Sequence, residues 1–298
     1  MKKSVLLLIT LCLLAGCGSK SPDYSSMLGT VTRDTLLGVP CQVYMPYAYS
    51  ARTKSGKEVF PVLYLQHGMY GSEDDWITQG DLLRLMDTML QSKAVREMVV
   101  VMPDNFLGSI PPTERQALMA APDLTPDNKP FDTSNGSAHW RKLTDEQEKN
   151  YEMSGYWETH FAEFMAEAES RYCISRDPSC RAIAGLSMGG FHTMHVSHHL
   201  HGQFGYIGLF SALVASPEDI PVYSNWQDEV RAAVADASLY WIGIGRDDFL
   251  YDQLQDYLRW LDENNLKYTY YESAGGHTWQ NWQDYIVRFM TTLFKAEQ

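Results

Sequence analysis

The chain has 298 residues, of which 45% are hydrophobic and 20% are charged, as in an ordinary globular protein with enough material for one large core. Its formal net charge is −13 at pH 7. This acidic balance argues against nucleic acid as a partner, because phosphate binding requires clustered lysine and arginine.

The first residues have the pattern of an export signal. Two lysines precede the apolar run SVLLLITLCLLAGC, which is too short to cross a bilayer as a helix. The end of the run, LLAGC, resembles the lipobox of bacterial lipoproteins, in which cleavage precedes a lipidated cysteine. The resemblance implies a signal peptide over residues 1–16, lipid on Cys17 and a polar tether over residues 17–27. We therefore expect an exported protein, lipid-anchored to a membrane surface on the periplasmic or outer face of the bacterial envelope. A plain secretory signal cleaved near Ala15 or Gly16 is the alternative.

The remaining chain, residues 28–298, alternates apolar runs with segments of helical periodicity. Runs without polar alternation are typical of parallel strands that are buried on both faces. We therefore expect one α/β domain with a mostly parallel, doubly wound sheet and flanking helices. An antiparallel pair of strands is expected over 28–46, and further strands at 62–68, 98–103, 181–187, 206–212, 239–245 and 268–274. The last helix is marked by an apolar stripe of Trp282, Tyr285, Ile286, Phe289, Met290 and Leu293.

Residues 106–150 interrupt this alternation with a stretch rich in proline, asparagine, aspartate and glycine. Long irregular insertions in compact domains are often lids or binding loops, and otherwise disordered. We expect a cover over the active site, with disorder as the alternative.

The segment AIAGLSMGGFHTMH contains the pattern G-x-S-x-G from Gly185 to Gly189. The five-residue pattern alone arises often by chance. Here it follows a strand-like run and opens a helix-like one, which is the context of a nucleophile held on a strained turn above a sheet. Ser187 is therefore the candidate nucleophile.

A serine hydroxyl needs a base to act as a nucleophile. Where the serine lies on such a strand-to-helix turn, an acidic residue and then the histidine base follow it in the chain. Asp247 and Asp248 follow the run at 239–245, and His277 lies between glycines and a tryptophan on a later loop. We predict that Ser187 is the nucleophile, that His277 is general base and then general acid, and that Asp248 orients the imidazole. Asp247 is the other candidate for the acid.

The developing oxyanion needs backbone donors. One is the N–H of Met188, and the second is expected in the loop QHGMYGSEDDW at Met69, with Tyr70 as the alternative. His67 in the same loop is expected to be structural.

Aromatic residues near these loops are candidate substrate-binding groups, because flat apolar rings suit a sugar or a cinnamoyl group. They are Trp76, Trp279 and Tyr70, while a place in the core is the alternative for the tryptophans and the expectation for Trp282.

Histidine and cysteine spacing bears on metal sites and disulfides. His195 and His199 have metal-ligand spacing, but the glutamate of H-E-x-x-H is absent, so we expect packed or solvated histidines, no metal and no other cofactor. A disulfide between Cys173 and Cys180 and three buried thiols, with Cys41 as the third, are the open alternatives.

The segments YLQHGMYGSEDDW, RAIAGLSMGGFHTM, GIGRDDF and GGHTWQNW together resemble the esterase branch of the α/β-hydrolases. This branch includes the feruloyl and acetylxylan esterases of carbohydrate esterase family one, S-formylglutathione hydrolase (esterase D) and the mycolyltransferases. The resemblance implies the α/β-hydrolase fold, and its G-x-x-D turn favours Asp248 as the acid. The insertion at 106–150 departs from the family and leaves the shape of the substrate open.

An exported member of this branch is expected to be a serine esterase that cleaves acetyl or feruloyl/cinnamoyl esters of polysaccharide, because formylglutathione is a cytosolic metabolite. Its expected partners are an acylated carbohydrate or small ester and, through the lipid, a membrane surface. An acyltransferase or peptidase of the same fold and a non-catalytic, tethered glycan-binding protein are the alternatives. The acyl group, the alcohol and the oligomeric state stay open.

Overall fold

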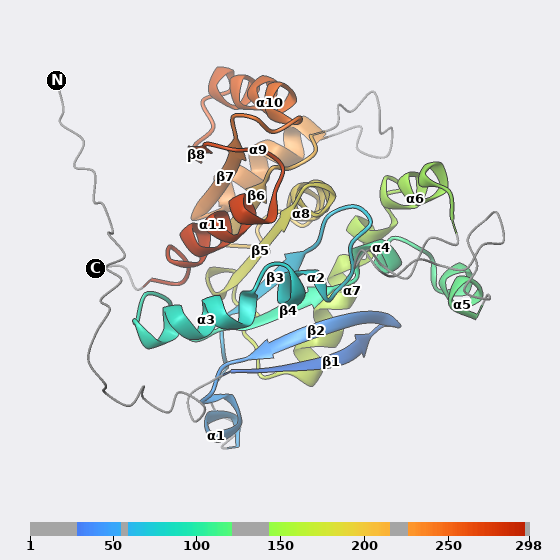
Figure 1. The fold of residues 1–298 in the computed structure, drawn as a ribbon, viewed down its shortest axis with the longest axis vertical. Coiled ribbons are helices and arrows are strands. Elements are labelled where there is room, and N and C mark those ends of the chain that lie inside the picture. Colours follow the sequence, from blue (N-terminus) through green and yellow to red (C-terminus); the bar gives the residue numbers. More distant parts are fainter. Residues whose placement is uncertain (1–28, 55–58, 121–142, 215–225, 296–298) are drawn as a thin grey trace, which may run out of the picture.

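A computed structural model describes most of the predicted α/β domain (Figure 1), namely residues 29–54, 59–120, 143–214 and 226–295. The predicted signal peptide, Cys17 and the tether lie outside the described residues, so these remain predictions. Among the described helices, none combines the length and apolarity that a membrane crossing requires.

The described residues form one eight-stranded sheet with the order β1-β2-β4-β3-β5-β6-β7-β8. β1 pairs with β2 and β2 with β4 in antiparallel fashion, and every later pairing is parallel. The prediction of a mostly parallel sheet is confirmed. The strands are β1 (Thr30–Leu36), β2 (Val39–Met45), β3 (Val62–Gln66), β4 (Val99–Pro103), β5 (Arg181–Leu186), β6 (Tyr206–Phe210), β7 (Leu239–Gly245) and β8 (Thr269–Ser273).

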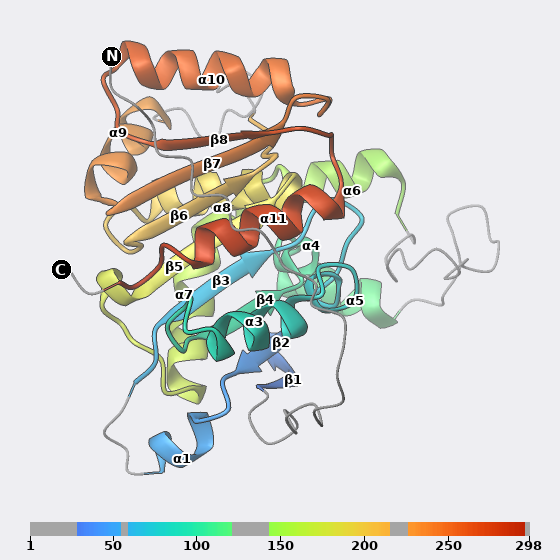
Figure 2. The same cartoon turned by 60° about the vertical axis from the view of Figure 1, so that its left-hand side comes forward.

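The central strands are mainly apolar because helices cover both faces of the sheet. Along β3, Val62 and Tyr64 enter one buried cluster, while Leu63 and Leu65 enter the cluster on the opposite face. Figure 2 shows α3 and α11 in front of the sheet and α7 and α8 behind it. The first face is covered by α7 (Tyr156–Arg171), α8 (Met188–His199), α9 (Trp226–Asp236) and α10 (Tyr251–Glu263), and the second by α2 (Asp75–Thr78), α3 (Leu82–Gln91) and α11 (Trp279–Met290).

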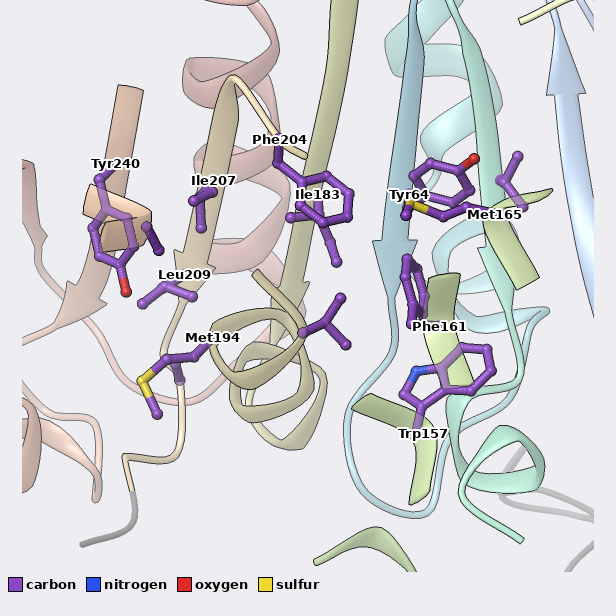
Figure 3. Close-up of a cluster of buried hydrophobic side chains, with 14 of the residues drawn as sticks. Tyr64, Trp157, Phe161, Met165, Ile183, Met194, Phe204, Ile207, Leu209 and Tyr240 are labelled. Carbon is purple, nitrogen blue, oxygen red and sulfur yellow. The ribbon is translucent and has the colours of Figure 1, made fainter. Parts of the chain in front are cut away.

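Aromatic rings fill the first face around Tyr64 (Figure 3). The ring centroid of Tyr64 lies 5.5 Å from that of Phe161 on α7, and 6.5 Å from that of Phe204, which precedes β6. Burying rings of this size stabilises the fold by about 2 kcal/mol or more each. The core thus fixes β3, β5 and β6 relative to one another, and these strands end at the loops described below.

The described parts of the 106–150 insertion are helical rather than irregular. They contain α4 (Asn105–Gly108), α5 (Pro112–Ala120) and α6 (Asp145–Glu152); a short α1 (Tyr49–Thr53) follows β2. Phe106, Leu107 and Ile110 are buried and pack with Leu118, Leu143 and Tyr151. An irregular cover is therefore the wrong description of these parts, because their apolar residues form a small core of their own. Residues 121–142 lie outside the described residues.

Cys41, Cys173 and Cys180 are all free thiols. Of the two open alternatives, a Cys173–Cys180 disulfide is contradicted, since a spacing around a turn does not by itself indicate a disulfide. The alternative of three buried thiols holds only for Cys41, since the other two are half-buried.

Candidate active site

Ser187 occupies a strained turn between β5 and α8. Its φ of 54° and ψ of −117° lie in a region that residues with a side chain rarely adopt. Neighbouring backbone holds it there. The Ser187 N–H donates to Phe210 O at 2.9 Å, and Ser187 O accepts from Phe191 N–H and Leu213 N–H at 3.1 Å each. The surrounding structure thus imposes the turn, with Ser187 half-buried between buried neighbours.

The glycines of the G-x-S-x-G pattern allow backbone to pack directly against backbone. A Cβ atom on Gly185 would lie 2.3 Å from Gly189 O, and one on Gly189 would lie 2.2 Å from His67 O. Neither position has space for a side chain. The turn therefore sits closely against the end of β3.

His277 and Asp248 form a hydrogen-bonded pair on the loops that follow β8 and β7. His277 Nδ1 lies 2.9 Å from Asp248 Oδ2 and 3.0 Å from Oδ1. The Asp248 side chain is fully buried, and the His277 side chain is 16% exposed. Asp247 is exposed and supports the loop through its own backbone N–H, which donates to Gly275 O at 3.0 Å. The structure therefore brings His277 together with Asp248 and not with Asp247.

The surroundings of Asp248 keep its carboxyl ionised. Burial acts to raise its pKa, but hydrogen bonding to His277 and to the Leu250 N–H at 3.0 Å outweighs burial, so the pKa is lowered. An ionised carboxylate accepts a hydrogen bond from the Nδ1–H of His277, so the proton stays on Nδ1. The other ring nitrogen, Nε2, is then free to accept a proton from a serine hydroxyl.

The three candidate catalytic residues follow the carboxyl ends of parallel strands. In the register of the sheet, Leu186 lies beside Phe210, Phe210 beside Gly243, and Gly245 beside Ser273. Ser187, Asp248 and His277 come just after β5, β7 and β8, so all three belong to one edge of the sheet (Figure 2). This edge is where ligands bind in open α/β sheets.

The loop after β3 lies beside Ser187, as the predicted oxyanion site requires. A Cβ atom on Gly68 would be 3.4 Å from Ser187 Cβ. Met69 follows in the chain and packs with Met188, the first residue of α8, whose N–H has no partner within the helix. Tyr70 has a φ of 62° and is 39% exposed. These positions suit the predicted donors, Met69 N–H and Met188 N–H.

His67 has the structural position that the sequence suggested. The His67 N–H donates to Asn105 Oδ1 at 2.9 Å, and Asn105 N–H donates to His67 Nε2 at 3.1 Å. His67 Nδ1 lies 2.7 Å from Gly68 O. The buried ring thus ties the loop after β3 to α4.

The aromatic candidates have different positions. Trp76 is only 1% exposed, its Nε1–H donates to Gln66 O at 3.0 Å, and its ring packs on Phe210. The expectation that it offers a face to substrate is wrong, because the short helix α2 carries the ring into the buried cluster on the second face of the sheet. Trp279 is half-buried against Trp76, and Trp282 is in the core, as expected.

Sequence reasoning missed Phe249, which is 76% exposed. Its ring centroid lies 4.5 Å from that of His277, while Trp282 contacts the same imidazole at 4.9 Å. Its place directly after the predicted acid was the available signal.

The histidines of α8 are mainly packed residues. His192 is buried with Nδ1 2.6 Å from Glu158 Oε1, and the Nε2 of buried His198 lies 3.0 Å from the Tyr240 hydroxyl. His195 is buried and His199 is exposed. Within the described ranges, no group of three or more histidine, cysteine, aspartate or glutamate side chains is arranged to hold a metal ion.

The sheet order and the placement of Ser187, Asp248 and His277 after β5, β7 and β8 are those of the α/β-hydrolase fold. Comparison with known families is more specific: residues 113–293, more than half of the chain, match the model of the Esterase family, described as "Putative esterase". The chain belongs to that family.

Two curated relatives and a solved structure resemble the chain. An endo-1,4-beta-xylanase/feruloyl esterase of Xylanibacter ruminicola is 32% identical over 178 residues, which are 60% of this chain and 20% of the relative. An acetyl esterase of Caldicellulosiruptor saccharolyticus is 25% identical over 174 residues, 47% of this chain and 65% of the relative. The chain thus spans about one fifth of the length of the Xylanibacter relative and just under two thirds of the length of the Caldicellulosiruptor relative. The ferulic acid esterase of Anaeromyces mucronatus in complex with ferulic acid shares the fold, with a TM-score of 0.64 at 19% identity over 93% of this chain and 94% of the other.

Proposed function

We propose that the protein is a serine esterase that forms an acyl-enzyme, and that its substrates are feruloyl or related hydroxycinnamoyl esters of polysaccharide. The observation that carries the chemistry is the hydrogen-bonded His277–Asp248 pair, with contacts of 2.9 and 3.0 Å, at the same sheet edge as the strained Ser187. The relative named as a xylanase/feruloyl esterase supports the choice of substrate.

The proposed reaction has two halves. The Ser187 oxygen attacks the ester carbonyl carbon while His277 Nε2 takes the hydroxyl proton, and the resulting oxyanion accepts hydrogen bonds from Met69 N–H and Met188 N–H. The bond to the alcohol oxygen then breaks as His277 returns the proton to the alcohol. A water molecule attacks the acyl-enzyme with His277 again as base, which releases the acid and restores the Ser187 hydroxyl.

An apolar wall beside Ser187 favours a large acyl group. Met188 and Phe191 are buried in it, and four half-buried side chains pack against them. Methionine side chains adapt to flat or irregular apolar groups, and an acetyl group would use little of this surface. We call this set the methionine wall; it consists of Met69, Met153, Met188, Phe191, Leu213 and Trp226.

A panel of esters tests the proposal. The purified domain is assayed with methyl ferulate, a feruloylated arabinoxylan oligosaccharide, acetylated xylan and 4-nitrophenyl acetate. Feruloyl esters should have the highest kcat/KM, and Ser187→Ala should lower kcat by about 10⁴-fold or more without unfolding the protein. Undiminished turnover by the alanine variant would refute the assignment of the nucleophile. Cleavage of acetylated xylan without cleavage of feruloyl esters would favour the second candidate, an acetyl esterase, which the Caldicellulosiruptor relative suggests.

We further propose that Cys17 carries lipid and holds the catalytic domain at the envelope surface of a bacterium. The support is the sequence LLAGC after a lysine-led apolar run. An anchored esterase of this kind would act where polymeric carbohydrate arrives from outside the cell.

A further inference from the structure

Phe249 is the most exposed of the large hydrophobic side chains that the structure describes, at 76%. A single exposed hydrophobic residue is ordinary and carries no meaning by itself. The position of this one is distinctive, because its ring lies 4.5 Å from the imidazole of His277, with 50° between the planes. An exposed aromatic side chain thus borders the candidate general acid–base.

The backbone on both sides of Phe249 is fixed. Asp248 N–H donates to Gly245 O at 3.1 Å, and Tyr251 N–H donates to Asp248 O at 2.9 Å. Leu250 N–H donates to the Asp248 carboxylate at 3.0 Å, and the Leu250 side chain is 8% exposed within the core. The outward direction of Phe249 is therefore a consequence of an anchored turn.

The reaction indicates which part of the ester lies beside Phe249 and His277. His277 returns its proton to the departing alcohol, so the alcohol component leaves past the imidazole. The acyl component is on the other side of the ester carbonyl, and we infer that it extends toward the methionine wall, whose members Met69 and Met188 flank the proposed oxyanion site. A group beside His277 and open to solvent is placed to contact the alcohol component.

We propose that Phe249 forms the alcohol-side subsite, where its ring stacks on the apolar face of the sugar that carries the acyl group. This inference rests on the proposed esterase function and adds a specificity-determining residue to it. A sugar ring presents C–H groups on one face, and an aromatic ring with an open face contacts them at little conformational cost. Phe249 then selects for sugar esters over esters of small alcohols.

Two esters of the same acid test the subsite, methyl ferulate and a feruloylated arabinoxylan oligosaccharide. Phe249→Ala should lower kcat/KM for the oligosaccharide about tenfold, mainly through a higher KM, because one aromatic contact is removed. Its kcat/KM for methyl ferulate should stay within about twofold. Phe249→Tyr should behave like the wild type on both esters. Tyr47→Ala is the matched control, since Tyr47 is 61% exposed and follows β2 near the opposite edge of the sheet.

The outcomes separate a subsite from a purely structural role. An equal loss on both esters would mean that Phe249 only supports His277, and no loss on either would mean that it touches no substrate; both results overturn the proposal. Binding is measured separately by calorimetry with the feruloylated oligosaccharide and Ser187→Ala. Addition of Phe249→Ala should weaken this binding about tenfold, and unchanged binding would also overturn the subsite. A wild-type protein that cleaves neither ester would refute the proposed function instead, and the binding comparison would still decide the subsite.

Discussion

Asp248→Asn is the sharpest test of the pairing between the two loops. Asparagine has the shape of aspartate and can still accept from Leu250 N–H, which lies 3.0 Å from Asp248 Oδ1. In the wild-type protein, both carboxylate oxygens of Asp248 lie within 3.0 Å of His277 Nδ1. The substitution replaces one of these oxygens by an NH₂ group. The imidazole then loses the acceptor that fixes its tautomer and offsets its positive charge. We expect kcat to fall by about 10⁴-fold, which corresponds to about 5.5 kcal/mol of transition-state stabilisation.

Asp247→Asn is the matched control, because Asp247 is exposed and acts in the loop through its backbone N–H. Initial rates with 4-nitrophenyl acetate, together with thermal unfolding of each variant, separate a catalytic loss from misfolding. The Asp247 variant should keep at least half of the wild-type kcat/KM. A large loss in the Asp247 variant with little loss in the Asp248 variant would refute our reading of the site.

Three further predictions concern packing, buried charge and location. Gly189→Ala should abolish esterase activity, because the new Cβ would lie 2.2 Å from the backbone oxygen of His67; a fully active, folded variant would contradict this packing. Burial raises the pKa of Glu152 to about 8, so the folded state holds a proton that the unfolded state releases near pH 4.5, and the melting temperature should fall as pH rises from 5 to 8. Glu152→Gln should flatten that slope, and a parallel pH curve for this variant would count against the assignment. Cys17→Ser should move the protein from the membrane fraction to the soluble fraction and prevent labelling by a tagged fatty acid, whereas unchanged fractionation would favour a plain secretory signal.

The parts of this fold that could be predicted from the sequence are those governed by local pattern. β3 and β5 are buried on both faces, so each contains an apolar run without polar alternation, from Val62 to Leu65 and from Ala182 to Leu186. Ser187 was recognisable because its turn excludes side chains on both flanks, which forces glycine at Gly185 and Gly189. The roles of His277 and Asp248 could be predicted because each follows a parallel strand, and the carboxyl ends of parallel strands lie at the same edge of the sheet.

What was missed depends on packing between distant segments. Trp76 and Phe249 are both aromatic residues in segments that follow strand ends beside the site, yet one is 1% exposed and the other 76%. No local pattern separates them, since the difference arises from Phe210 and Trp279 under one ring and from the anchored turn under the other. The helices within 106–150 were hidden in the same way, because their small apolar cluster joins Phe106 to Tyr151 across a long separation in the chain.

The positive φ of Ser187 creates a trade-off between catalytic activity and folding stability in this protein. A non-glycine residue in such a conformation costs about 1–3 kcal/mol of folding stability. Glycine would relieve that cost, while its extra freedom in the unfolded chain returns only about 1 kcal/mol. A dead enzyme with glycine at this position would then be as heat-resistant as the working one, or more so. Cellular quality control acts on misfolded chains, so it would not remove a stable but inactive variant with glycine at this position. Selection for the reaction itself is then what keeps the serine in place.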